Sequence, residues 1–244
     1  MVDFTGGTWR SLIDGSEVSA IPDSLVLQYA ATNVSGGDTT WSDDNEVADM
    51  TLTGGETDTT VDDVEALGFD GTDDHGNIDL PSDFEGDGLN EFTVEFSIST
   101  TTSDNGRVFE QRNNDENQDL GFIMNSGPTG TGGFLWVFDD DNGDRFRFGP
   151  DSDPNLNDGE RHDISIIIED AVNHEATVII DESEIGIDVT DSDSPNSFTT
   201  WDNEMGIAAR NDGGSMNNHL EVDVLAMRWY SEAIEDQTIN KYPL

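Results

Sequence analysis

The chain has 244 residues, of which 54 are Asp or Glu and nine are Lys or Arg, so its formal net charge is −45. It contains no cysteine, which excludes disulfides, thiolate metal sites and a cysteine nucleophile. The lack of a basic cluster argues against binding to nucleic acid or to anionic lipid, and no apolar run is long enough for a transmembrane helix. We therefore expect no nucleic-acid partner and no membrane insertion.

The acidic residues are interleaved with apolar segments, and 5 Trp and 12 Phe supply material for a core. A disordered acidic chain is the alternative, but this pattern favours a folded protein adapted to high salt. In molar salt the Debye length falls to about 3 Å, which screens the self-repulsion of such a surface. The composition thus predicts a halophilic source, either a haloarchaeon or one of its viruses.

Residues 1–23 differ from the rest and contain Gly6-Gly7, Trp9 and Pro22. We interpret them as an N-terminal arm for anchoring or oligomerisation, with an ordinary frayed terminus as the alternative. The first residues are neither basic nor followed by an apolar stretch, so no signal peptide is expected. Residues 24–244 are predicted to form one domain.

From Leu25 onward the chain reads as short strands separated by turns rich in Gly, Asn and Asp. The clearest strand is Phe92–Ile98, in which apolar and polar residues alternate strictly; this period is typical of a half-buried strand. One helical turn is expected at 231–237. The other predicted strands are 25–29, 107–109, 120–124, 134–138, 145–148, 164–168, 176–180, 185–189, 205–209 and 222–230. Many short, evenly spaced strands predict an all-β, two-sheet antiparallel sandwich of jelly-roll type.

Several segments resemble, in order, those of laminin-G-like domains in the concanavalin A-like lectin/glucanase group. The resemblance covers residues 24–244 and implies the concanavalin A-like jelly roll. Arg161 stands where that family has Trp, and Glu182-Ser183 replaces its Gly. The matching segments are Gly68-Phe69-Asp70-Gly71-Thr72-Asp73-Asp74, Glu91–Phe96, Asp158-Gly159-Glu160-Arg161-His162-Asp163-Ile164, Ala176–Glu182, Met205–Ile207, Val222–Val224 and Trp229–Ile234.

Glucanases of this fold carry catalytic carboxylates two residues apart on one strand, and Glu221 and Asp223 have that spacing. The third acid of the pattern is missing, because Ala226 and Met227 stand there. No nucleophile elbow and no pair of histidines with zinc-ligand spacing occurs. We therefore predict no catalytic residues and no enzyme activity, with an enzyme acting on polysaccharide as the alternative.

Calcium or another hard divalent cation is the candidate cofactor, because hard cations take carboxylate, amide and carbonyl oxygens from loops. The segments Asn113-Asn114-Asp115-Glu116-Asn117 and Asn211-Asp212-Gly213-Gly214 resemble the pentraxin-type calcium pattern. The resemblance implies a site formed by Asp115, Asn117, Asn211 and Asp212, but solvated loops of a halophilic protein are the favoured interpretation of these residues.

Aromatic side chains in strands, including Trp136, Phe138, Phe146 and Phe148, are expected in the core. Trp41 and Trp201 lie in polar stretches and are the candidates for exposed stacking on a ligand.

These features together predict a non-enzymatic module on the surface of a haloarchaeal virion, of the turret, decoration or tail-fibre type. It would form a homo-oligomer and would also contact other virion or surface proteins. Its ligand would be a glycan or protein on the host surface. A cell-surface or extracellular location, and a purely structural component without a ligand, are the alternatives.

Overall fold

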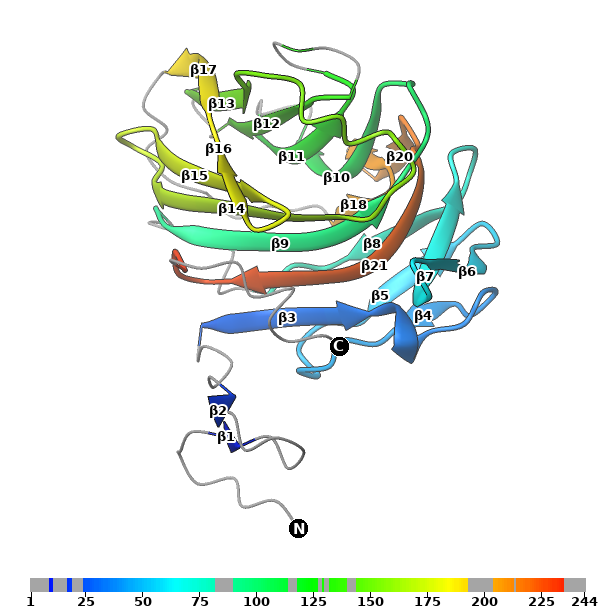
Figure 1. Cartoon of the computed structure of the whole chain (residues 1–244). Coiled ribbons are helices and arrows are strands. Elements are labelled where there is room, and N and C mark those ends of the chain that lie inside the picture. The colour runs from blue at the N-terminus through cyan, green and yellow to red at the C-terminus, as the bar shows by residue number, and fades with distance from the viewer. Residues whose placement is uncertain are drawn as a thin grey trace.

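A computed structural model describes residues 24–81, 90–113, 118–126, 129, 132–139, 144–192, 204–212 and 214–234, together with two short strands nearer the N-terminus (Figure 1). Those two strands, β1 (Trp9–Arg10) and β2 (Glu17–Val18), pair with each other in an antiparallel ribbon. The remainder of the predicted arm at 1–23 lies outside the described residues. Among the described residues, no helix is long and apolar enough to cross a membrane.

The domain is an all-β sandwich of two stacked sheets, and in Figure 1 the broad strands β14, β9, β21 and β3 run beneath β10–β13. The first sheet, sheet I, has eleven strands and the second, sheet II, has eight. Every pairing is antiparallel except that of β10 with β19.

Sheet I runs in the order β17-β13-β12-β11-β10-β18-β8-β5-β4, with β19 beside β10 and β20 beside β19. Its strands are β4 (Thr40–Trp41), β5 (Met50–Thr53), β8 (His75–Ile78), β10 (Gly106–Asn113), β11 (Gln118–Met124), β12 (Phe134–Asp139), β13 (Arg145–Pro150), β17 (Ile187–Ser192), β18 (Met205–Ile207), β19 (Arg210–Asp212) and β20 (Ser215–Asn217).

Sheet II runs in the order β16-β15-β14-β9-β21-β7-β6, with β3 beside β21. Its strands are β3 (Leu25–Ala30), β6 (Thr57–Val61), β7 (Val64–Asp70), β9 (Phe92–Ser99), β14 (His162–Asp170), β15 (Glu175–Ile180), β16 (Ser183–Ile185) and β21 (Glu221–Tyr230). A short 3₁₀ turn, η1 (Ala31–Asn33), follows β3.

The core lies between the sheets and is rich in aromatic rings. Phe96 of β9 contacts Phe122 of β11 edge-on, with ring centroids 4.8 Å apart, and both side chains are fully buried. Burying a side chain of this size contributes about 2 kcal/mol. Trp136, Phe138, Phe146 and Phe148 are buried as expected.

The alternation in β9 is confirmed, but its outer face is also buried. Glu95 is fully buried on that face and accepts hydrogen bonds from the hydroxyls of Ser165 (2.8 Å) and Tyr230 (3.1 Å). The chain after β21 folds back over it, because the Ile234 amide donates to the Thr93 hydroxyl. The part of the expected helical turn that is described, 231–234, is irregular instead.

The outer face of sheet I carries five of the nine cationic residues of the chain. We call it the arginine face. Cross-strand register places their side chains together with acidic side chains and opposite to the core-facing aromatics. The five are Arg107, Arg112, Arg145, Arg147 and Arg210.

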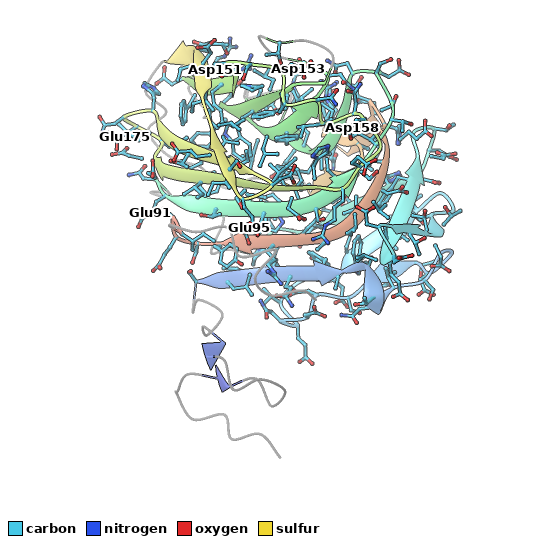
Figure 2. The ribbon with its side chains drawn as sticks, viewed as in Figure 1. Glu91, Glu95, Asp151, Asp153, Asp158 and Glu175 are labelled. Carbon is cyan, nitrogen blue, oxygen red and sulfur yellow. The ribbon has the colours of Figure 1, made fainter. Side chains whose placement is uncertain are left out.

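Elsewhere the surface is dominated by carboxylates. The exposed side chains of Glu91, Asp151 and Glu175 lie at the periphery of the sandwich (Figure 2).

The strands predicted from the sequence are present, with 185–189 divided between β16 and β17. The additional strands are mostly short or polar, as in β6, where three of the five residues are Thr.

Candidate functional site

An open cleft of about 610 Å³ lies where the end of β7, the end of β9 and the start of β21 meet. Five carboxylates, four hydroxyl side chains and four glycines line it. Among the described residues that line the cleft, none is Lys or Arg. The carboxylates are Asp70, Asp73, Asp74, Glu221 and Asp223, and the hydroxyls are Thr57, Ser99, Thr100 and Thr101.

The turn after β7 supplies three of these carboxylates. One Asp70 oxygen accepts the Thr72 amide at 2.7 Å and the Asp73 amide at 3.4 Å, while Asp74 accepts the Asp70 amide at 3.1 Å. Gly71 has φ +74°, a left-handed conformation that suits glycine. The turn therefore brings ligand oxygens of Asp70, Asp73 and Asp74 within 4.8 Å of one another.

Burial and like charge act together on this cluster. Burial raises the pKa of Asp74, and the neighbouring charges of Asp70 and Asp73 raise it further. Burial also raises the pKa of Glu56, and the charge of Asp74 adds to it. In contrast, the amide of Thr72 lowers the pKa of the exposed Asp70. The cleft thus concentrates negative charge that no Lys or Arg among its described lining residues offsets.

Two glycines allow these groups to approach the backbone. A Cβ at Gly54 would lie 2.2 Å from an Asp74 carboxylate oxygen and 2.5 Å from the Asp74 Cα. A Cβ at Gly68 would lie 2.9 Å from an Asp223 oxygen. Such distances are far below van der Waals contact, so larger residues at these positions would displace the carboxylates.

Strand β21 places the second acidic pair in the same cleft. Glu221 is in register with Asp70, and Asp223 is in register with Gly68 and Ser99. Burial raises the pKa of Asp223, and the charge of Glu221 adds to it. The predicted pair therefore faces the cleft, but β21 itself supplies no third acid. Carboxylates and hydroxyls in this arrangement are suited to holding a hard cation or a polyhydroxylated ligand.

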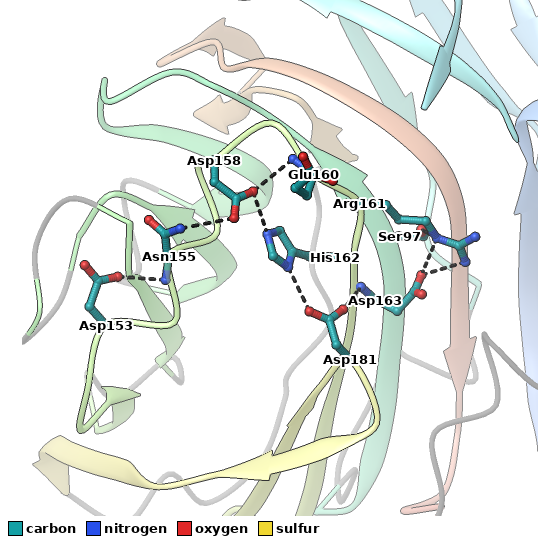
Figure 3. Close-up of polar contacts among 9 residues, drawn as sticks. All are labelled: Ser97, Asp153, Asn155, Asp158, Glu160, Arg161, His162, Asp163 and Asp181. Carbon is teal, nitrogen blue, oxygen red and sulfur yellow. Dashed lines mark hydrogen bonds and ion pairs between the residues drawn. The ribbon is translucent and has the colours of Figure 1, made fainter. Parts of the chain in front are cut away.

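The opposite wall of the cleft is a turn held by hydrogen bonds. The Gly159 amide donates to the Thr100 carbonyl at 3.0 Å, and the Ser99 hydroxyl donates to the Gly159 carbonyl at 3.0 Å. The Thr100 hydroxyl donates to the Glu221 carbonyl at 2.6 Å. Figure 3 shows the polar network behind this turn, which includes Asp158 and His162.

The predicted calcium ligands are not among the lining residues of this cleft. Asp115 and Asn117 lie outside the described residues. Asn211 and Asp212 lie in β19, which pairs in parallel with β10 and sets Asp212 beside Arg112. Asn211 is buried; its Oδ1 accepts the Gly214 amide at 2.8 Å, and Asp212 pairs with Arg210 at 2.9 Å.

The prediction that Trp41 is an exposed stacking platform is wrong. Its side chain is fully buried, its indole N–H donates to the Ala30 carbonyl at 2.8 Å, and it contacts Tyr29 edge-on. The short strand β4 turns this residue into the core although its sequence neighbours are polar. Trp201 lies outside the described residues.

Sequence reasoning did not single out Asp70, Asp73 and Asp74 as site residues. They belong to a segment noted for its resemblance to laminin-G-like domains, so the signal was three acids in one turn directly after a strand. Among 54 acids such a group is not distinctive until the fold sets it against Glu221 and Asp223.

Comparisons with known proteins bear on the fold. No family model matches the chain, and no curated protein does. Among solved structures, the binding domain of botulinum neurotoxin serotype D aligns with TM-score 0.61 and 12% identity over 90% of this chain and 51% of its own. The binding domain of Paraclostridial Mosquitocidal Protein 1 gives TM-score 0.58 and 13% identity over 87% and 50%.

A Trypanosoma rangeli sialidase in complex with sialic acid aligns with TM-score 0.58 and 13% identity over 93% of this chain and 33% of that chain. This chain therefore spans about half, or a third, of the length of these structures. At such low identity the likeness establishes the fold: the domain is a concanavalin A-like two-sheet sandwich.

Proposed function

We propose that this domain is a non-catalytic binding module whose ligand site is the acidic cleft, and that it binds its ligand through a divalent cation such as Ca²⁺. The observation that carries the proposal is the turn containing Asp70, Asp73 and Asp74, whose ligand oxygens lie within 4.8 Å of one another. Ca²⁺ takes six to eight oxygen ligands in flexible geometry, so three carboxylates leave coordination positions for a ligand.

The ligand class follows from the rest of the cleft. Thr57 and Thr101 offer hydroxyls, and Glu221 and Asp223 offer acceptors. These groups suit the hydroxyls of a glycan, which also coordinate Ca²⁺. A surface glycan of a host cell is therefore the proposed ligand, and a surface protein with exposed carboxylates is the alternative.

The proposed setting is a virion surface, in a turret, decoration or tail-fibre protein of a haloarchaeal virus, with a cell-surface or extracellular location as the alternative. The large acid excess supports a high-salt setting. Residues 1–23 are proposed to join copies of the chain into a homo-oligomer, which would in turn contact other virion proteins. Light scattering in about 3 M salt should show an oligomer for the full chain and a monomer for a chain beginning at Ser24. A monomer in both cases would contradict the assembly.

The cation proposal is tested by thermal melting with added Ca²⁺ at fixed ionic strength. At about 100 times Kd, binding stabilises the native state by about 2.7 kcal/mol, or about 6–10 °C for a chain of this size. The double variant Asp73→Asn/Asp74→Asn should lose this shift. The charge-matched control Asp151→Asn/Glu175→Gln, at exposed positions far from the turn in sequence, should keep it. Equal shifts in both variants would overturn the site.

A second candidate function is hydrolysis of polysaccharide, favoured by the placement of Glu221 and Asp223 in one cleft and by the raised pKa of Asp223. Paired carboxylates, one of them holding a proton, are what glycoside hydrolysis needs. Release of reducing ends that disappears in both Glu221→Gln and Asp223→Asn would favour the enzyme over the binding module.

A further inference from the structure

One wall of the cleft depends on a histidine that does not itself line it. His162 begins β14 and is almost enclosed, with 9% of its side chain exposed. Its Nδ1 lies 2.9 Å from Asp181 Oδ2, and its Nε2 lies 3.2 Å from Asp158 Oδ1 (Figure 3). Both ring nitrogens therefore face carboxylate oxygens. A neutral imidazole has one N–H, so only the imidazolium donates to both.

The two carboxylates belong to different turns. Asp158 also accepts the Glu160 amide at 2.9 Å, which closes the turn around Gly159. Asp181, in the turn between β15 and β16, accepts the Asp163 amide at 2.9 Å and donates its own amide to the Asp163 carbonyl at 2.9 Å. His162 thus joins the turn 158–160, which forms the cleft wall, to a turn anchored on β14.

The ring nitrogens of His162 lie within 3.2 Å of two carboxylates, those of Asp158 and Asp181. The carboxylate of Asp163 is bound by Arg161 at 2.8 Å. Strand β9 presents the apolar Ile98 opposite His162. The remaining charges of the two turns, those of Glu160 and Glu182, are on exposed residues.

We propose that His162 is a positioning residue of the cleft and that its ring holds the wall in place. By contacting both carboxylates, the ring keeps the Gly159 turn beside Thr100. Without this ring, Asp158 loses its link to Asp181, and the two carboxylates face each other with no group between them. The wall then loosens, so ligand binding at the cleft weakens. This consequence rests on the proposed function, whereas the link from His162 to Gly159 does not.

The direct readout is hydrogen exchange of the Gly159 amide, measured by NMR and corrected for the intrinsic rate. We expect protection of this amide to be about two- to tenfold lower in the variant His162→Gln than in the wild type, as for the loss of one hydrogen bond. The control His174→Gln, in the turn between β14 and β15, should behave as the wild type.

Ca²⁺ titration by calorimetry tests the consequence for binding. We expect His162→Gln to bind Ca²⁺ more weakly than the wild type and His174→Gln to bind it as the wild type does.

Equal Gly159 protection in His162→Gln and in the wild type overturns the proposal. If His162→Gln does not fold, Asp181→Asn removes one of the two carboxylate partners of His162 from an exposed turn and is read in the same way. Lower Gly159 protection in His162→Gln, without Ca²⁺ binding to either protein, upholds the positioning role and overturns the proposed cation site.

Discussion

The cleft and the arginine face treat carboxylates in opposite ways. On the arginine face, buried acids have cationic neighbours: Arg107 binds Glu110, and Arg147 binds Asp139 through both of its oxygens. In the cleft, five carboxylates converge with no Lys or Arg among the described lining residues. A chain with nine cations has concentrated five of them where acids are buried within a sheet. The charge of the cleft carboxylates can therefore be offset only by water, bound protons or dissolved cations.

One buried acid on the arginine face, Asp119, has a strongly raised pKa in spite of the nearby arginines. Asp119 lies beside Glu110, and burial together with that carboxyl raises the pKa of Asp119 well above its usual range. Burial also raises the pKa of Asp139 despite its ion pair with Arg147. Compensation on this face is therefore local, and it differs from one acid to the next.

The largest expected effect comes from filling the cleft. Gly54→Ala places a Cβ within 2.5 Å of the Asp74 backbone, at φ +124°, and should destabilise the domain by about 3 kcal/mol. The neighbouring Gly55→Ala is the control, because its φ is also positive but nothing lies within 4 Å. Chemical denaturation of both variants measures the difference, and equal losses would show that the cleft is not packed against Asp74.

Removing a cation from the arginine face should cost somewhat less. Arg147→Ala leaves the buried Asp139 without its two-point partner and should destabilise the domain by about 2 kcal/mol. Arg145→Ala is the matched control, since Arg145 contacts the same carboxylate at 3.5 Å and is more exposed; about 0.5 kcal/mol is expected there. Similar losses in denaturant titrations would contradict the distinction.

The buried Asp119 on the arginine face predicts a pH dependence. Because the pKa of Asp119 is raised in the native state, the native state holds its proton above the ordinary carboxyl range, and stability falls as pH rises through that window. Asp119→Asn should remove this fall. Asp170 gives the opposite pH dependence. The side chain of Asn173 lowers the pKa of Asp170, so ionised Asp170 stabilises the native state and this stabilisation is lost as pH falls. Asp170→Asn should therefore remove a loss of stability at low pH. Melting curves against pH distinguish the two.

The smallest effect concerns salt. Asp74→Asn removes one of the crowded charges of the cleft and should stabilise the domain by about 0.5 kcal/mol at low ionic strength and by less in molar salt. Melting temperatures across a salt series measure this. An unchanged salt dependence would mean that the cleft is already neutralised by protons.

Local pattern identified most of the strands that build the core, but it missed β5, β7 and β8, which also supply core side chains. The alternation of Phe92–Ile98 identified β9 because one face of a strand must be apolar to pack against another sheet. The same reasoning missed β6, whose threonines carry no such signal, and it placed Trp41 on the surface. Burial of Trp41 depends on the pairing of β4 with β5, which polar neighbours in sequence do not reveal.

The sequence by itself determined the composition of the site without its location. It contained the acids at the end of β7 and in the turn after it, and the pair Glu221 and Asp223 about 150 residues further along the chain. Tertiary structure decided that they meet, because β21 pairs with β7 in a register that sets Glu221 beside Asp70. It also decided which acids receive an arginine. Both outcomes depend on strand pairing between distant segments, and the physical reason is that a strand's own residues fix its faces but not its neighbour.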